Sequence, residues 1–267
     1  MEFSRALIDS SGYDREGFAE CYDRFRPPTP GVLLDVLCRY ARRDRPALVV
    51  DLGCGTGLST RAWSGRAERI VGIEPNAAMV AAAAPAPGVE YQQAFADDTG
   101  LDDGSADIVT CSQSLHWMEP EPTFAEVARI LRPGGVFAAY DYDWPPFVDP
   151  EVDEAFVAYE ERRAAARKAR GLKRGADTWP KHEHLARMRV SGHFHFCREF
   201  VLHSVESGDA ERIAGFARSL GIPVADRHDE ELEEELRIAE LEAVASRVLD
   251  ARTVPFVFGY RVRVGVA

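Results

Sequence analysis

The sequence predicts an α/β fold in which a doubly wound, mostly parallel sheet carries helices on both faces. Strand-like apolar segments alternate with helical segments along the 267 residues, which is typical of parallel strands joined by crossover helices. Residues 47–51 form the first strand, because a run that is apolar up to Asp51 suits a strand buried on both faces. A loop with three alternate glycines and a helical stretch at 58–63 follow. A strand, a glycine loop and a helix are the first half of a nucleotide-binding βαβ unit.

The glycine loop and the end of the next strand together predict a cofactor site. Gly53, Gly55 and Gly57 lack a Cβ, so the backbone can turn sharply and lie close against a ligand. The second strand, at 69–73, ends in Glu74, where an acid in such a unit binds the two ribose hydroxyls.

Two cofactors compete for this geometry. A dinucleotide site requires Gly-x-Gly-x-x-Gly, but here Leu58 occupies the last position and the third glycine comes one residue early. Asp51 at the mouth of the loop would also repel a pyrophosphate. S-adenosylmethionine carries a sulfonium and an ammonium instead, so the loop favours S-adenosylmethionine over NAD. An NAD-dependent oxidoreductase is the alternative.

Three motifs resemble those of the class I, or seven-strand, methyltransferases. Residues 51–57 (DLGCGTG) are similar to the first motif of that family, and residues 131–135 (LRPGG) to the turn before its fifth strand. Residues 22–27 (YDRFRP) resemble the N-terminal lid of the type-11, trans-aconitate-methyltransferase-like group. The resemblance implies a Rossmann-like sheet of seven strands, the last one antiparallel, with helical lid insertions. It also implies methyl transfer from S-adenosylmethionine to a small molecule.

The chain divides into four parts on this interpretation. We expect an N-terminal helical lid at 1–45, a cofactor-binding core at 46–145, a helical cap insertion at 146–192, and strands six and seven within 193–267. The sixth strand is expected at 193–202 and the seventh at 254–266. A helical insertion at 209–249 separates them, with single helices predicted over 209–220 and 229–249.

By the resemblance, Tyr22 and Arg26 contact the methionine end of the cofactor, and residues 95–97 hold the adenine. Phe95 stands where the family often has an aspartate, and an aromatic ring there would cover the adenine face. The candidate cofactor-binding residues are Tyr22, Arg26, Asp51, Gly53, Cys54, Gly55, Gly57, Glu74, Pro75, Phe95, Ala96, Asp97 and Ser112.

The acceptor is expected beyond the fourth and fifth strands, because ligands of open α/β sheets bind at the carboxyl ends of the strands. His116 follows the fourth strand and is the candidate catalytic base for a hydroxyl or carbon acid, since its ordinary pKa suits work near neutrality. The alternative is that His116 only shapes the pocket wall, and a carboxylate acceptor would need no base. The Asn/Asp-Pro-Pro-aromatic motif of many amino-group methyltransferases is absent, which disfavours a nucleobase acceptor. The candidate substrate-pocket residues are Trp117, Tyr140, Tyr142, Trp144 and His182.

Composition limits the partners. The net charge of −12 disfavours nucleic acid, and five scattered cysteines suit a reducing cytoplasm. Because no apolar stretch is long enough for a membrane span and the N-terminus lacks a signal peptide, we expect a cytoplasmic protein without a membrane partner. The paired histidines at 182/184 and 193/195 lack a third ligand nearby, so no metal is expected. The oligomeric state is left open, and a fold that binds S-adenosylmethionine without methylating is a further alternative.

Overall fold

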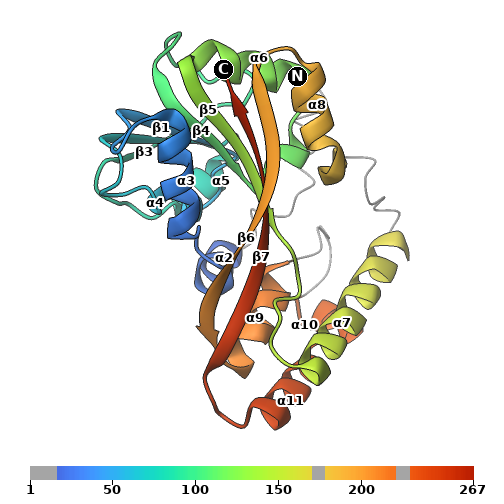
Figure 1. The fold of residues 1–267 in the computed structure, drawn as a ribbon. Coiled ribbons are helices and arrows are strands. Elements are labelled where there is room, and N and C mark those ends of the chain that lie inside the picture. Colours follow the sequence, from blue (N-terminus) through green and yellow to red (C-terminus); the bar gives the residue numbers. More distant parts are fainter. Residues whose placement is uncertain (1–16, 170–177, 221–228) are drawn as a thin grey trace.

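The computed structural model describes residues 17–169, 178–220 and 229–267, so the first sixteen residues of the expected lid lie outside it (Figure 1). Seven strands form one sheet in the order β3-β2-β1-β4-β5-β7-β6. Strands β1 to β5 pair in parallel, whereas β7 runs antiparallel between β5 and β6. This confirms the predicted fold class. The strands are β1 Leu48–Leu52, β2 Arg69–Ile73, β3 Val89–Gln92, β4 Ala106–Ser112, β5 Leu131–Tyr142, β6 Phe196–Gly208 and β7 Val254–Val266.

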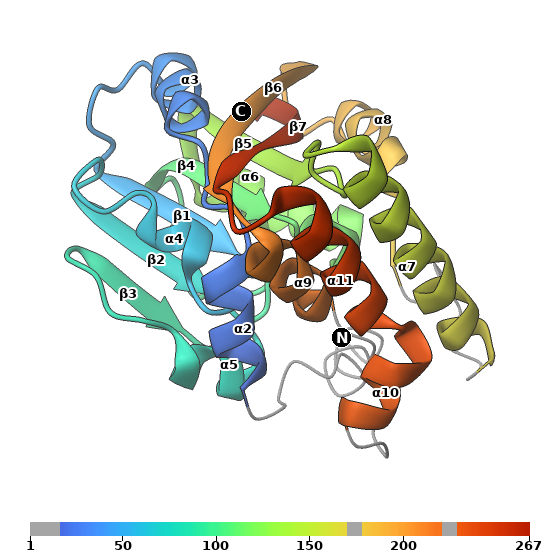
Figure 2. The ribbon, with the colours of Figure 1, turned by 90° about the horizontal axis from the view of Figure 1, so that it is seen from below.

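Helices cover both faces of the sheet (Figure 2). All five residues of β1 are buried, as its uninterrupted apolar run predicted, and they alternate between two cores. Val49 belongs to the core that contains the apolar residues of α3, and Val50 belongs to the core on the other face, which contains residues of α6 and α8. The helices of the first two thirds of the chain are α2 Phe18–Phe25, α3 Gly31–Ala41, α4 Leu58–Arg61, α5 Ala77–Ala82, α6 Pro120–Ile130 and α7 Pro150–Ala169. The later ones are α8 His184–Val190, α9 Ala210–Ser219, α10 Asp229–Leu236 and α11 Ile238–Leu249, with short 3-10 turns at Leu115–Trp117 and Lys181–Glu183.

Strands β6 and β7 form a long ribbon that extends beyond the parallel strands. They pair over thirteen residues, from Phe196 opposite Val266 to Gly208 opposite Val254. Figure 1 shows α7, α9, α10 and α11 beside the lower half of this ribbon, and α2 packs on α9. The helices between the last strands therefore form one layer with the N-terminal helix, next to the carboxyl ends of the parallel strands.

Three element boundaries differ from the sequence expectation. The single helix expected over 229–249 is two helices, because Arg237 adopts a left-handed backbone conformation (φ 55°) that no α-helix contains. Strand β6 runs from Phe196 to Gly208, so it begins three residues later and ends six residues later than expected. Strand β5 begins at Leu131, so the residues expected as a turn before it belong to the strand, where residues 132–135 form an irregularity in its register to β4.

The described helices lack the long uncharged apolar stretch that spanning a lipid bilayer would require.

Candidate functional site

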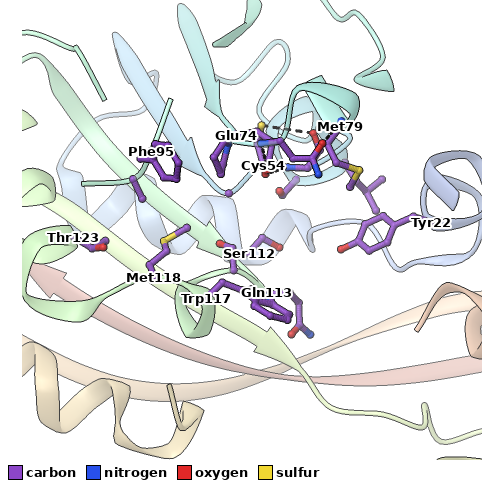
Figure 3. A pocket seen from close by; sticks show the side chains of 18 of the residues that line it. Tyr22, Cys54, Glu74, Met79, Phe95, Ser112, Gln113, Trp117, Met118 and Thr123 are labelled. Atoms are coloured by element: carbon purple, nitrogen blue, oxygen red, sulfur yellow. Dashed lines mark hydrogen bonds between the residues drawn. The ribbon is translucent and has the colours of Figure 1, made fainter. Parts of the chain in front are cut away.

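A pocket lies at the carboxyl ends of β1, β2 and β4, and α2 forms part of its wall. Figure 3 shows Phe95 and Thr123 at one end of this pocket and Tyr22 at the other, with Glu74 and Cys54 facing Trp117 and Gln113 across it. Thirteen of the candidate residues line the pocket: Tyr22, Arg26, Gly53, Cys54, Gly55, Glu74, Pro75, Phe95, Ala96, Asp97, Ser112, Trp117 and Tyr142. Six do not: Asp51, Gly57, His116, Tyr140, Trp144 and His182.

The glycine loop has a conformation that other residues would strain. Gly53 and Gly57 have φ of +66° and +81°, which is left-handed backbone. A Cβ on Gly57 would lie 2.1 Å from the Tyr91 hydroxyl, and one on Gly53 would lie 2.7 Å from the Ser114 Cβ. Gly57 therefore shapes the loop from behind without itself lining the pocket.

Glu74 is held at the end of β2 by two backbone amides. Its Oε2 accepts a hydrogen bond from the amide of Gly55 at 3.0 Å, and its Oε1 accepts one from the amide of Asn76 at 3.0 Å. Burial raises the pKa of Glu74, and the two amides oppose that shift without cancelling it. Since a carboxylate offers about four acceptor sites, both oxygens can still accept from a ligand in the pocket.

Asp51 does not lie at the mouth of the loop, which corrects the sequence expectation. It is fully buried, and its carboxylate accepts hydrogen bonds from the hydroxyls of Ser59 (2.6 Å), Thr60 (2.8 Å) and Thr110 (2.8 Å). Burial raises its pKa, and the three hydroxyls act in the opposite direction. Asp51 therefore ties the start of α4 and the neighbouring strand β4 to β1, and it does not line the pocket.

A pyrophosphate in the pocket would be repelled by acids of the pocket wall and not by Asp51. Glu74, Asp97 and Glu119 line it, against Arg26 as the one basic side chain among the described lining residues. This excess of acid favours a cationic ligand.

Helix α2 brings Tyr22 and Arg26 to the pocket. Arg26 is 9% exposed and donates to the Tyr142 hydroxyl at 2.7 Å and to the Ser219 carbonyl at 2.8 Å. Its guanidinium lies 4.7 Å from the centre of the Tyr22 ring, a cation–π geometry. The helix is also fastened to the glycine loop, because Asp23 accepts from the Thr56 hydroxyl and pairs with Arg61 at 2.5 Å.

His116 lies behind the pocket wall. Its ring is 5.2 Å from the ring of Trp117, which does line the pocket, and its Nδ1 is buried without a hydrogen-bond partner among the described residues. Burial, followed by the nearby Lys181 ammonium, lowers the pKa of His116 to about 3. A neutral imidazole of such low basicity is a weak acceptor of protons at neutral pH.

The other candidates outside the pocket have structural surroundings. Tyr140 is buried, and its hydroxyl lies 3.1 Å from the Thr29 hydroxyl. Trp144 lies over the cations of Arg26 and Lys181, with ring distances of 5.8 and 5.6 Å. The His182 side chain is 83% exposed and is not among the residues that line the pocket.

Sequence reasoning missed Gln113, which has an unusual backbone for a non-glycine residue (φ 55°). The side-chain Nε2 of Gln113 donates to the Tyr142 carbonyl at 3.0 Å, and its side-chain Oε1 accepts from the Lys181 ammonium at 2.5 Å. Its position directly after β4 was the available signal. The other lining residues that were missed are Pro27, Thr29, Leu58, Ser59, Asn76, Met79, Ser114, Met118, Glu119 and Thr123.

The strand order with an antiparallel β7, together with a glycine loop facing an acid at the end of β2, defines the class I methyltransferase fold. Residues 50–139 match the family model of a methyltransferase domain. Within this segment, about a third of the chain, the sequence is similar to the type-11 methyltransferases.

Three comparisons describe the relationship. A structure of an Anaeromyxobacter dehalogenans protein classed as a type II methyltransferase is 27% identical, with a TM-score of 0.66 over 91% of this chain and 98% of that one. CRG1 of Saccharomyces cerevisiae, described as a probable S-adenosylmethionine-dependent methyltransferase, is 31% identical over 52% of this chain and 50% of its own length. An uncharacterized methyltransferase of Mycobacterium tuberculosis is 37% identical over 43% of this chain and 46% of its own length. The chain therefore matches about half the length of these curated relatives.

Proposed function

We propose that this protein transfers a methyl group from S-adenosylmethionine to a small-molecule acceptor. The observation that carries the proposal is Glu74, whose carboxylate is fixed by the amides of Gly55 and Asn76 at the wall of an acid-rich pocket. The same acid-rich wall disfavours NAD, and so does α4, a single turn of four residues that offers a pyrophosphate little helix dipole.

The pocket residues fit the donor molecule part by part. Both Glu74 oxygens can accept from ribose hydroxyls, and the glycine loop lets its backbone approach the nucleoside. Phe95 and Ala96 offer an apolar surface for the adenine at one end. Tyr22 and Arg26 lie at the other end, where the arginine suits the carboxylate of the methionine part.

The acceptor side is formed by aromatic and amide groups. S-adenosylmethionine supplies a methyl that its sulfonium has already activated, so the chain must place the acceptor in line and exclude water. Trp117 and Tyr142 provide apolar cover, and the clamped amide of Gln113 fixes the wall between them. We propose that His116 supports this wall through Trp117 and takes no proton, which suits an acceptor that needs no base.

A calorimetric comparison of two glutamine variants tests the donor site. Glu74→Gln keeps the shape but removes the charge-assisted acceptor, so S-adenosylmethionine binding is expected to weaken by about ten- to a hundredfold. The matched control is Glu90→Gln on strand β3, which pairs with Arg69 at the surface outside the pocket and should bind as the unmodified chain does.

Unchanged affinity in Glu74→Gln would contradict the proposed donor site. Tight binding of S-adenosylmethionine by the unmodified chain, with no S-adenosylhomocysteine formed across a broad acceptor screen, would instead favour a protein that binds the donor without methylating.

A further inference from the structure

Strand β6 forms the outer edge of the sheet, and it is unusually open for an edge strand. It pairs with β7 on one side only, and Figure 2 shows it at the periphery of the described molecule. Val201 and Val205 are 68% and 58% exposed on the face that no described helix covers there. Residues 198–206 (REFVLHSVE) contain no proline and pair with β7 without a bulge, so the devices that could protect this edge are its charged side chains, Arg198, Glu199 and Glu206.

Two arginines mark the limits of the open edge. Arg189 donates to the Cys197 carbonyl at 3.5 Å, and Arg212 donates to the Ser207 carbonyl. The amide and carbonyl groups of successive residues in an antiparallel strand point alternately to its two edges. Because the carbonyls of Cys197 and Ser207 point away from β7, the odd-numbered residues between them also direct their amide and carbonyl groups outward. The midpoint of the open stretch is Leu202.

The charges on the strand have the same midpoint. Arg198 is exposed, and the contact it makes is a long hydrogen bond of 3.5 Å to the Tyr40 hydroxyl. Glu206 pairs with no cation among the described residues. Since 198 and 206 are equally far from 202, a strand that pairs with itself around Leu202 places each arginine opposite a glutamate.

We propose that β6 is a dimer interface in which two copies of the chain pair their edge strands antiparallel around Leu202. Arg198 then lies opposite the partner's Glu206 in two symmetric ion pairs. The outward backbone groups of Val201 and Glu199 pair with those of the partner's His203 and Val205. Val201 also comes within diagonal reach of the partner's Val205, which covers the exposed apolar side chains. The occupant is a second copy because both the limits of the open edge and the charges are symmetric about one residue, as a twofold axis requires.

Size-exclusion chromatography with light scattering tests this proposal on the full chain. The unmodified protein is expected at twice its mass of 29.6 kDa at micromolar concentration. Arg198→Glu and Glu206→Arg each turn two ion pairs into two like-charge contacts, so each should weaken the dimer about tenfold or more. The double variant R198E/E206R restores opposite charges and should recover the dimer.

Two controls keep the result interpretable. Val157→Arg replaces an apolar residue that is 46% exposed on α7, a helix that packs on α10 and α11, and it should leave the dimer intact. Melting temperatures of all variants show whether each chain is folded. A monomeric unmodified protein, a dimer indifferent to both single reversals, or a double variant that stays monomeric would each overturn the proposal.

Discussion

The two ends of the pocket are held by contacts that span very different distances along the chain. At the glycine-loop end, Asp51 bonds Ser59 eight residues away, and Glu74 bonds Gly55 nineteen residues away. At the end formed by α2, β5 and the residues around Lys181, the bond from Arg26 to Tyr142 spans 116 residues. The glycine-loop end thus depends mostly on near neighbours in the chain, with Thr110 at 59 residues from Asp51 as its most distant partner, whereas the other end requires the whole chain to fold.

The two ends also differ in how buried charge is compensated. The carboxylate of Asp51 is surrounded by neutral hydroxyls. Asp141 on β5 instead lies between two cations, Arg263 at 2.6 Å and Lys181 at 2.7 Å. Arg263 extends this chain of charges to Glu199 on β6 at 2.9 Å. The ionic network connects four elements across the sheet, so removal of one member leaves a buried charge with one partner fewer.

The largest effect is therefore expected from Asp141→Asn. It removes one of the two carboxylates that pair with Arg263, whose side chain is 3% exposed and keeps only Glu199 at 2.9 Å, so the free energy of unfolding should fall by about 2–3 kcal/mol. Urea denaturation measures this. Asp143→Asn, two residues along and exposed, should change stability by less than about 0.5 kcal/mol. A loss below about 1 kcal/mol in Asp141→Asn would show that the network does not hold this end.

A substitution in the glycine loop should change the affinity for S-adenosylmethionine more than the free energy of unfolding. Gly57→Ala drives a Cβ into the Tyr91 hydroxyl and so displaces the loop, and S-adenosylmethionine affinity is expected to fall by about tenfold or more. Gly65→Ala is the matched control, because its φ is also positive (+77°) but no atom lies within 4 Å of the added Cβ. Equal affinities in the two variants, measured by calorimetry, would mean that the loop geometry does not govern binding.

As pH falls, the contribution of Asp107 to folding stability should change in the direction opposite to that of Asp51. Burial raises the pKa of Asp107, but hydrogen bonds from Arg132 and from the amides of Ala47 (2.6 Å) and Leu48 (3.3 Å) outweigh it, so the pKa is lowered. The stability it contributes is present above its ordinary pKa and is lost as pH falls through the lowered value. The raised pKa of Asp51 has the reverse sign, because its protonation favours the folded state as pH falls.

As the pH is lowered from about 5 to about 2, the free energy of unfolding of Asp107→Asn should consequently fall less than that of the unmodified chain. Denaturant titrations at each pH give the comparison. Asp35→Asn, in an exposed ion pair with Arg66, is expected to follow the unmodified chain. If the free energy of unfolding of Asp107→Asn and of the unmodified chain fell in parallel with pH, the pKa of Asp107 would not be lowered by folding.

The smallest effect is expected from His116→Ala. Because His116 lies behind Trp117 and its pKa is lowered to about 3, the rate of S-adenosylhomocysteine formation should fall by less than about tenfold. A fall of about a hundredfold or more, with donor affinity unchanged, would instead identify His116 as the base.

The same contrast in chain distance explains what could be predicted from the sequence. The glycine loop, Glu74 and the apolar run of β1 lie within thirty residues, so their spacing alone indicates the donor site and the fold. The direction of the Asp51 side chain was not predictable, because it depends on Thr110 of another strand. Gln113 owes its orientation to Lys181, and His116 owes its burial to elements that follow it in the chain. No local pattern encodes these contacts.

Calorimetric titration of the unmodified chain tests the central claim most directly. With S-adenosylhomocysteine as the titrant, we predict saturable heat at one site per chain, and with NAD no measurable heat. Saturable binding of NAD together with no heat from S-adenosylhomocysteine would contradict the assignment of Glu74 and the glycine loop as the donor site.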